Sequence, residues 1–418
     1  MKIHFLGACR EVGRSGFAVE IDGKYIVLDY GVLMDHEVGF PAHLPPKDVD
    51  SIILSHAHLD HSGLLPIFYL RDKTPLYGVE PSFQLSNLLI KDFLNISGYL
   101  LPFEYIDLES MMGCCINIPY GQRFNRLGAE ITLLNAGHIP GSCQTLIEAD
   151  SKRILYTGDF NTTPTRLLGP ADPRYDDLDC LIVESTYATE EHPDRGMMEE
   201  EFVSQATEVV KEGGVVLVPA FGVGRSQEII SILAARGFKY PVYVDGMALK
   251  TIHILENFGS SLRDPEFFKR AVRNAEWIDN WKERRKAAST PSVIVSPAGM
   301  LKGGSAIFYL ERIARDKKNA IFLVSFQIPG TPGSILLEKK KFIIKGRSRK
   351  VDAKVMKFDF SSHVGKNELH DVLKKLDSRT KVFVVHGAEE NCRSLANYAQ
   401  KELGLEAIAP EAGEAIQI

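Results

Sequence analysis

The chain has few features of a secreted or membrane-bound protein. Its 418 residues include six cysteines, scattered without a CxxC pair, so neither a disulfide framework nor a cysteine zinc knuckle is expected. No apolar run approaches the roughly 20 residues that cross a bilayer. The first residues, MKIHFLGACREVG, lack the long apolar segment of a secretory signal. These absences predict a soluble protein of the cytoplasm that does not bind membranes.

Positive charge is also scarce. The 49 lysines and arginines are outnumbered by 54 acidic residues, and the net charge is -5. The basic balance that often marks nucleic-acid-binding proteins is therefore missing, and any nucleic acid must be bound by local patches. Two basic runs, KERRK and LEKKKFIIKGRSRK, are such patches or merely solvated faces. Both interpretations remain open at this point.

The hydrophobic pattern indicates two domains, as the length also does. Short β-branched segments bounded by Gly, Asp and Pro predict a sheet-rich first part. Amphipathic helices then alternate with buried strands, which is typical of a parallel α/β sheet. From about Phe342, strand-like segments resume. We predict an α/β protein whose first domain, residues 1–190, is interrupted by a second, residues 191–344, and completed by residues 345–418.

The densest group of polar residues is the segment HAHLDH, directly after the apolar run SIIL. It holds the imidazoles of His56, His58 and His61 and the carboxylate of Asp60 at the end of a predicted strand. A single histidine is more often solvated or hydrogen-bonded. Gathering so many polar groups is costly, however, unless a metal organises them. The segment therefore predicts a metal site.

Three more candidate ligands each follow a predicted strand: His138 in LLNAGHIPGS, Asp159 in RILYTGDFN and His386 in KVFVVHGAEE. Each is weak evidence alone, but hydrolytic sites often hold two metals about 3.5–4 Å apart, and one loop cannot supply both. Asp29 in YIVLDYG has the same placement. We expect it to accept a hydrogen bond that steadies a ligand.

Taken together, these motifs resemble the metallo-β-lactamase superfamily, in which HxHxDH, the GHIPGS histidine and the TGD aspartate occur in this order. The segments LIVESTYA, VPAFGVGRSQEI, VYVDGMA, SPAGML, DFSSH and VVHG resemble its β-CASP nucleases. That branch includes the endonuclease of pre-mRNA 3′-end formation, its archaeal and bacterial relatives, ribonuclease J and DNA-repair nucleases. The resemblance implies a metallo-β-lactamase αββα sandwich with an inserted α/β β-CASP domain.

The resemblance also implies two zinc ions per chain, with ligands carried over motif by motif. One zinc would be bound by His56, His58, His138 and Asp159. The other would be bound by Asp60, His61, His386 and a bridging Asp159. Because Asp159 would contact both ions, it is also a candidate catalytic residue, as is Asp60.

Two further residues match motifs that distinguish the β-CASP branch. Glu184 in ESTYA matches an acidic residue, and His363 in SSHV matches a histidine. The resemblance implies that they pair near the scissile phosphate, where His363 would give a proton or a hydrogen bond. Ser361 and Ser362 of the same motif would contact the substrate.

The glycine-rich segment PAFGVGRSQE is similar to a phosphate-binding loop but lacks the P-loop lysine. We favour a structural role in which Arg225 and Glu228 pair at the start of a helix. Arg225 remains a candidate substrate contact, and no nucleotide cofactor is required.

The leading hypothesis is a zinc-dependent ribonuclease that hydrolyses single-stranded RNA, with an endonuclease favoured over a 5′–3′ exonuclease. A DNA nuclease, a small-molecule metallo-hydrolase and a catalytically silent RNA-binding subunit are the alternatives. The complete ligand set argues against a silent subunit, and the large inserted domain argues against a small substrate. The N-terminus starts at a predicted strand, so we expect no KH domain. A homodimer or an RNA-processing complex would then help to select the RNA.

Overall fold

The computed structural model describes residues 1–34, 38–344 and 347–418. These residues form two compact units. Unit 1 comprises Met1–Pro164, Pro170–Glu191 and Ser362–Ile418. Unit 2 comprises Thr165–Gly169 and His192–Ser361. The chain thus leaves unit 1 close to the predicted position but returns to it at Ser362, later than residue 345. Residue 345 itself lies outside the described residues.

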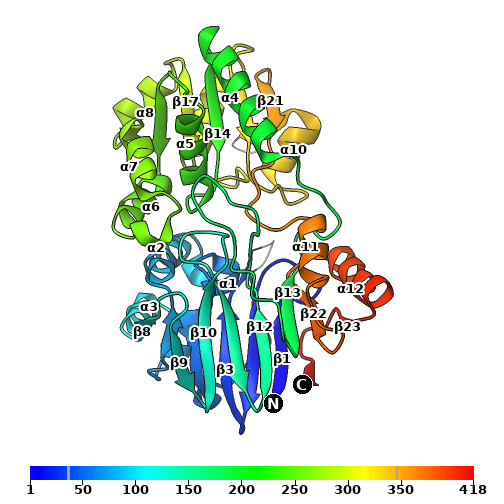
Figure 1. Ribbon diagram of the computed structural model, residues 1–418. Helices are drawn as coiled ribbons and strands as arrows, with labels where there is room; N and C mark the ends of the chain where they lie inside the picture. Colours follow the sequence, from blue (N-terminus) through cyan, green and yellow to red (C-terminus); the bar gives the residue numbers. More distant parts are fainter. Residues whose placement is uncertain (35–37, 345–346) are drawn as a thin grey trace. The chain divides into compact units, whose positions relative to one another are not determined.

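The first sheet of unit 1 has seven strands, and it joins the two ends of the chain. In spatial order they are β24 (Ala415–Gln417), β1 (Lys2–Gly7), β2 (Gly16–Ile21), β3 (Lys24–Tyr30), β6 (Val49–Ile53), β7 (Leu76–Gly78) and β8 (Cys115–Asn117). From β24 to β3 the neighbouring strands pair antiparallel, whereas from β3 to β8 they pair parallel. The pairing of β24 with β1 brings the two termini together (Figure 1).

The second sheet of unit 1 also has seven strands. They are β23 (Glu406–Ile408), β22 (Lys381–Val385), β13 (Cys180–Glu184), β12 (Lys152–Tyr156), β11 (Cys143–Ala149), β10 (Ala129–Asn135) and β9 (Arg123–Arg126). The returning strand β22 lies parallel to β13, with Glu184 opposite Val385. This register sets the residue after β22, His386, beside the end of β13.

The two sheets pack face to face, and helices cover their outer faces. In the apolar run of β22, Phe383 and Val385 enter the core between the sheets, whereas Val382 and Val384 face the outer helices. The helices of unit 1 are α1 (Leu59–Ser62), α2 (Glu80–Ser97), α3 (Tyr105–Met112), α11 (Lys366–Leu373) and α12 (Glu389–Leu403). The first three pack on the first sheet and the last two on the second (Figure 1). The predicted αββα sandwich is confirmed.

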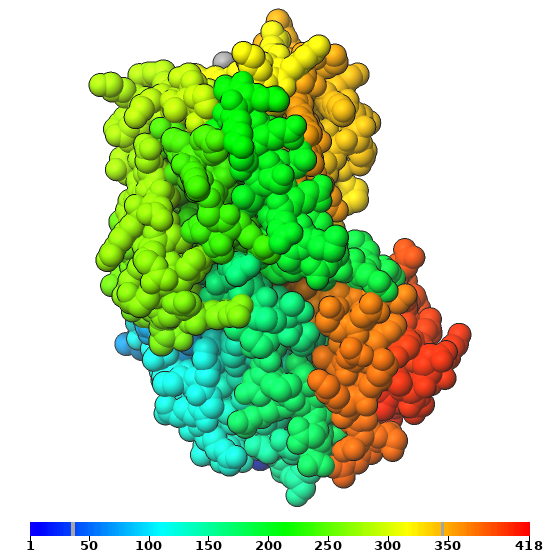
Figure 2. Space-filling view, turned by 45° about the horizontal axis from the view of Figure 1, so that its top comes forward, coloured from blue at the N-terminus to red at the C-terminus, as the bar shows by residue number. Residues whose placement is uncertain are grey.

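The returning segment, Ser362–Ile418, forms part of the surface of unit 1 as well as part of its core. In Figure 2 the orange residues of this segment lie beside the green residues that precede β13. Beneath that surface Leu369 and Val372 of α11 belong to the same apolar cluster as Tyr175 and Leu178. Segments about 190 residues apart in the sequence thus share one core.

Unit 2 is a parallel α/β unit, as predicted. Its six strands are β16 (Glu276–Ile278), β15 (Val242–Asp245), β17 (Ser292–Ser296), β14 (Val215–Pro219), β18 (Ala320–Leu323) and β21 (Lys354–Lys357), and all their pairings are parallel. Its helices are α4 (Arg195–Lys211), α5 (Arg225–Ala235), α6 (Met247–Glu256), α7 (Pro265–Arg273), α8 (Trp281–Ala287), α9 (Ser305–Ile313) and α10 (Pro332–Lys339).

Strand β21 explains why the chain returns to unit 1 later than predicted. We expected the strands after Phe342 to rejoin the first domain. Instead β21 pairs with β18, with Ala320 opposite Lys354, because this edge of the sheet satisfies its backbone hydrogen bonds. Strands β19 (Lys341–Ile344) and β20 (Arg347–Lys350) form a separate hairpin. Most of the longer basic run lies in this hairpin, whose residues 345–346 are outside the described part.

Short elements complete the two units. They are β4 (Leu33–Met34), β5 (Val38–Gly39), η1 (Pro46–Asp48), η2 (Leu65–Tyr69), η3 (Gly98–Leu100) and η4 (Gly259–Ser261). Among the helices of the described residues, none has both the length and the apolar character that a membrane span requires.

Candidate metal centre

Four strands of unit 1 end at one edge of the sandwich, and each is followed by a polar residue or motif. HAHLDH follows β6, His138 follows β10, Asp159 follows β12 and His386 follows β22. The antiparallel neighbour β11 leaves β10 and β12 pointing the same way, and β12, β13 and β22 are parallel. The strand directions therefore carry His138, Asp159 and His386 to the same edge of the second sheet.

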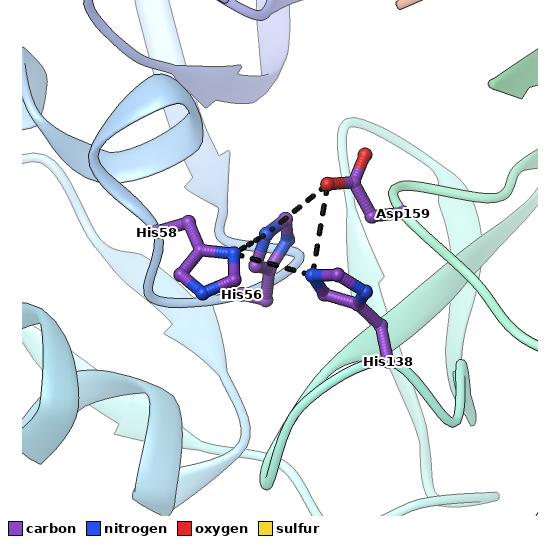
Figure 3. A group of neighbouring side chains, drawn as sticks. All are labelled: His56, His58, His138 and Asp159. Atoms are coloured by element: carbon purple, nitrogen blue, oxygen red, sulfur yellow. Dashed lines mark hydrogen bonds and ion pairs between the residues drawn. The ribbon is translucent and has the colours of Figure 1, made fainter. Parts of the chain in front are cut away.

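The first group consists of His56, His58, His138 and Asp159 (Figure 3). His58 Nδ1 lies 3.2 Å from His56 Nε2 and 3.2 Å from His138 Nε2. Asp159 Oδ2 lies 3.5 Å from His56 Nε2 and 3.7 Å from His138 Nε2. One donor atom of each residue thus faces a common point, and all four atoms lie within 4.8 Å of one another.

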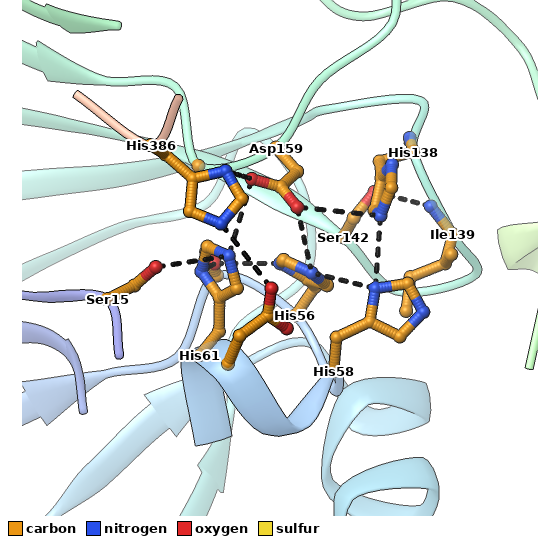
Figure 4. Close-up of polar contacts among 12 residues, drawn as sticks. Ser15, His56, His58, His61, His138, Ile139, Ser142, Asp159 and His386 are labelled. Carbon is orange, nitrogen blue, oxygen red and sulfur yellow. Dashed lines mark hydrogen bonds and ion pairs between the residues drawn. The ribbon is translucent and has the colours of Figure 1, made fainter. Parts of the chain in front are cut away.

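The second group consists of Asp60, His61, His386 and again Asp159, of which Figure 4 labels His61, His386 and Asp159. Asp159 Oδ1 lies 3.3 Å from His61 Nε2 and 3.1 Å from His386 Nδ1. His386 Nε2 lies 3.4 Å from Asp60 Oδ2. The two oxygens of Asp159 therefore face different groups, Oδ2 the first and Oδ1 the second.

Asp29 orients the second group from behind. Its carboxylate is fully buried and accepts hydrogen bonds from the Ser55 backbone N–H at 2.7 Å, the Ser55 hydroxyl at 2.6 Å and the Tyr156 hydroxyl at 2.8 Å. His61 Nδ1 lies 2.7 Å from Asp29 Oδ2. A proton held there leaves Nε2 of His61 to face Asp159.

The backbone at this edge is strained at two of these side chains. Asp29 has φ +59° and His386 has φ +48°, which is the left-handed region that residues other than glycine rarely adopt. Such conformations persist where the surrounding structure fixes them, and they gather at functional sites. For His386, the backbone N–H donates to the carbonyl of Ala8 at 2.7 Å.

The protonation states in the first group favour a cation. Burial lowers the pKa of His56, His58 and His138, in the case of His58 to about 4. These imidazoles are therefore neutral near pH 7 and have free lone pairs. His138 Nδ1 must carry a proton, because it lies 2.9 Å from the carbonyl oxygen of Ser362. The lone pair of His138 is then on Nε2, the atom that faces Asp159.

The carboxylate shared by the two groups remains ionised. Burial alone would raise the pKa of Asp159, but His386 and His61 outweigh it and lower that pKa well below its usual value. Burial likewise opposes the charge of His61, yet Asp159 and Asp29 raise its pKa. The site is therefore strongly polar although almost entirely buried.

The donor set fits divalent metal ions. Imidazole nitrogens and carboxylate oxygens are typical ligands of zinc and of other first-row transition metals. Within the described part of the chain, Asp159 Oδ1 and His386 Nε2 are buried side-chain atoms without a hydrogen-bond partner. Since an unsatisfied buried polar atom is costly, both atoms are explained most simply as ligands.

Glu184 and His363 form a third group with Asp159. His363 Nδ1 lies 3.0 Å from each oxygen of Glu184. The Glu184 carboxylate, 1% exposed, also accepts from the Phe160 N–H at 2.9 Å and the Thr186 hydroxyl at 2.5 Å. These contacts hold the proton of His363 on Nδ1, while the side chain of His363 stays 19% exposed.

The candidate substrate residues occupy different units. Ser362 belongs to unit 1, where its carbonyl binds His138, whereas Ser361 belongs to unit 2. The Ser361 N–H donates to Asp359 at 2.9 Å, and its carbonyl accepts from Arg195 at 3.3 Å. Substrate binding by Ser361 and Ser362 stays a prediction.

Arg225 begins helix α5, as expected from the sequence. The Glu228 carboxylate accepts hydrogen bonds from Arg195 at 2.5 Å and from the backbone N–H groups of Arg166 and Leu167, and its pairing with Arg225 stays a prediction. Glu228 lies inside unit 2, where it satisfies the hydrogen-bonding needs of these two backbone N–H groups. Its role is structural, and the role of Arg225 stays a prediction.

Sequence reasoning missed three residues that hold the site in place. Ser55 and Tyr156 both donate to Asp29, and Thr186 donates to Glu184. Ser55 precedes HAHLDH directly, so its position gave a signal. Tyr156 and Thr186 gave none, because a buried tyrosine or threonine in a strand-like segment is ordinarily a packing residue.

Three family models match the chain. The metallo-beta-lactamase superfamily matches residues 10–191, the Beta-Casp domain matches residues 227–336, and the Zn-dependent metallo-hydrolase RNA specificity domain matches residues 348–410. The last match spans the end of unit 2 and most of the returning segment. The three models together cover most of the chain in this order.

Curated relatives match over the whole chain. The chain is 40% identical to the protein named RNase aCSPSF2 of Saccharolobus solfataricus, with 100% of this chain and 85% of that protein covered. It is 36% identical to Probable RNase MJ4 of Methanocaldococcus jannaschii, with both proteins covered completely. It is 32% identical to Transcription termination factor FttA of Pyrococcus abyssi, of which it covers 71%.

A solved structure has the same fold. A protein of unknown function from Enterococcus faecalis superposes with a TM-score of 0.62 at 16% identity, covering 100% of this chain and 99% of that one. At this identity the likeness concerns the fold alone.

Proposed function

The chain belongs to the β-CASP branch of the metallo-β-lactamase superfamily, and on that premise we propose that it hydrolyses single-stranded RNA with two zinc ions. Membership makes it a metal-dependent hydrolase that acts on RNA. The observation that carries the finer proposal is Asp159, whose two oxygens face two separate groups of ligands. The relatives named as RNases support the choice of substrate.

His56, His58, His138 and Asp159 Oδ2 would hold one zinc, and Asp60, His61, His386 and Asp159 Oδ1 the other. When bound, the ions would supply Lewis acidity that activates water and neutralises charge on the phosphate. Asp29 would keep His61 in the required tautomer through its hydrogen bond to Nδ1. Water as the nucleophile excludes a 2′,3′-cyclic phosphate, and departure of the 3′ oxygen would leave a 5′-phosphate and a 3′-hydroxyl.

His363 would protonate the leaving oxygen. Its Nδ1 is held by Glu184 at 3.0 Å, which leaves Nε2 as the atom able to meet a substrate. Glu184 would stabilise the imidazolium, since a buried carboxylate that accepts from a histidine favours its charged form. Glu184 is therefore a positioning residue in this proposal, and His363 is the catalytic acid.

We favour an endonuclease, although a 5′–3′ exonuclease shares the same chemistry. One experiment tests the proposal: the purified chain is analysed for bound metal and incubated with RNA labelled internally or at its 5′ end. We expect two zinc ions per chain and internal fragments ending in a 3′-hydroxyl. Release of 5′ mononucleotides as the first product would instead identify an exonuclease. Full activity after exhaustive chelation would overturn the metal mechanism.

The same assay separates the remaining alternatives. A single-stranded DNA of the same sequence should be cut far more slowly than the RNA. Equal rates on DNA would contradict the preference for RNA. Binding of RNA by the fully metal-loaded chain without any cleavage would identify a silent RNA-binding subunit.

A further inference from the structure

Helix α8 of unit 2 presents an exposed tryptophan among basic side chains. Trp281 is 59% exposed, and it is the first residue of the helix. Between residues 276 and 318, all of them described, no other large hydrophobic side chain is exposed. Burial of an indole is favourable, so its exposure here calls for an explanation.

The indole ring of Trp281 is held in place by contacts with Arg284 and Phe308. The guanidinium of Arg284 lies over its ring, 4.7 Å from the ring centre. Arg284 is itself fixed by two hydrogen bonds of 2.7 Å to Asp245, a fully buried carboxylate that also accepts from the Tyr309 hydroxyl. The rings of Trp281 and Phe308 also pack edge-on, with ring centres 5.3 Å apart. With one face covered by Arg284, the exposed area of the ring is available to a second planar group.

The surroundings of the indole are basic. Helix α8 carries four basic residues and one acidic residue in WKERRKA. Lys282, Arg285 and Lys286 are exposed, whereas Glu283 is partly buried and accepts from the Asp279 N–H. On helix α9, Arg312 lies over Phe308 at 3.5 Å, next to the exposed Glu311. The exposed charges around the indole are therefore four basic residues, Lys282, Arg285, Lys286 and Arg312, and two acidic ones, Asp279 and Glu311, a positive balance in a chain with a net charge of -5.

We propose that Trp281 is a stacking platform for a base of single-stranded RNA, with Arg285 and Lys286 contacting the neighbouring phosphates. Proteins that bind single strands combine aromatic stacking with a positively charged surface. A protein partner fits less well, because an interface core needs contiguous apolar area and here a single indole is exposed. This RNA-binding site is separate in sequence from the metal ligands. That its ligand is RNA rests on the proposed function.

The chain itself provides the probe. It has two tryptophans, and the other, Trp277 on β16, is partly buried against the ring of His253 at 4.7 Å. In the Trp277→Phe protein, loaded with metal, Trp281 is the only tryptophan. We expect its fluorescence to be quenched by a single-stranded RNA with phosphorothioate linkages, which resists hydrolysis. Trp277→Phe itself should bind this RNA as the wild type does.

Affinity for the same RNA gives the quantitative test. Trp281→Ala should weaken binding about 5- to 150-fold, the range expected for one stacked base. Trp281→Phe should recover part of this loss, because a phenyl ring still stacks. Replacing Arg285 and Lys286 by Gln should reduce the dependence of binding on salt.

Several outcomes would overturn the proposal. One is an unquenched Trp281 together with wild-type affinity in Trp281→Ala. Another is a change in the oligomeric state of Trp281→Ala at unchanged RNA affinity, which would assign the surface to a second copy of the chain. If the wild type did not cleave RNA but RNA still quenched Trp281, the proposed function would be contradicted and the proposed RNA-binding site would be supported.

Discussion

Each unit contains a buried group of charged side chains, and the two groups differ in how their charges are satisfied. In unit 2, the arginine cluster consists of Glu199 and Glu228 with Arg166, Arg195 and Arg236. Every carboxylate oxygen of Glu199 and Glu228 accepts at least one hydrogen bond from the protein. In the metal centre of unit 1, Asp159 Oδ1 and His386 Nε2 have no such partner among the described residues.

The difference distinguishes a structural cluster from a binding site. In the arginine cluster, Arg166 of the short segment 165–169 forms an ion pair of 2.6 Å with Glu199 of helix α4. The carboxylates of this cluster are thus neutralised by side chains of the protein. In the metal centre the ligand atoms point toward one another. Such an arrangement of buried polar atoms is stable only when a cation lies among them. The carboxylates of Glu199, Glu228 and Asp159 are similarly buried, so burial of a carboxylate alone does not reveal function. The direction of the donor atoms does.

The largest expected effect is that of Asp159→Ala. Because its carboxylate faces both ligand groups, its loss should lower the cleavage rate by about 10⁴-fold or more and reduce the content of both metals. Metal analysis and single-turnover kinetics measure this, and circular dichroism should show an intact fold. Asp177→Ala, which removes a carboxylate exposed on the surface of unit 1, is the matched control. An active, folded Asp159→Ala protein would remove the bridging role.

His363→Ala should have the next largest effect, a loss of about 10²–10⁴-fold in cleavage rate, as is usual for a general acid. Metal content should stay unchanged. An RNA with a good leaving group at the scissile position should recover part of the rate, because that group needs no proton. His370→Ala, on the nearby helix α11, is the control. A variant that loses one metal would show that His363 is a ligand, and an unaltered rate would make it structural.

Asp29→Asn should weaken metal binding more modestly, by about 10- to 100-fold, the usual effect of altering the partner of a histidine ligand. The amide keeps the size of the side chain but loses the charge that holds Nδ1–H of His61. Competition with a chelator measures the affinity. Tyr156→Phe, which removes one hydrogen bond to Asp29, should have a smaller effect. Equal affinity in Asp29→Asn and the wild type would contradict the orienting role.

Glu199→Gln should leave turnover and metal content unchanged while lowering the free energy of unfolding by about 1–3 kcal/mol, the cost of leaving buried partners unsatisfied. Denaturant titration at neutral pH measures it. A loss of metal in this variant would show that the two groups are coupled, and an unchanged stability would show that the cluster contributes nothing.

The pH dependence of the same variant sharpens this test. Burial alone would raise the pKa of Glu199, but hydrogen bonds from Arg166 and Arg236 lower it. The stabilisation is therefore present above the unfolded pKa, about 4.3 for glutamate, and is lost as the pH falls through the lower folded value. The stability difference between wild type and Glu199→Gln should shrink over that acidic range.

Local sequence patterns were enough to predict the fold class and most of the candidate ligands. Alternating and continuous apolar runs predict strands because side-chain direction in a strand repeats every two residues, and His56 to His61 form one local motif. His138, Asp159 and His386 could be selected because each directly follows such a run. The resemblance to a known branch added Glu184 and His363, which no local pattern distinguishes.

Which atoms face one another depends on how distant segments of the chain pack together. The orientation of Asp159 toward two groups, the hold of Tyr156 on Asp29 and the pairing of Glu228 with Arg195 all join residues far apart in the chain. The place of β21 was decided by which sheet offered a free edge. Such choices depend on long-range packing and hydrogen bonding, whose energies a local sequence pattern does not contain.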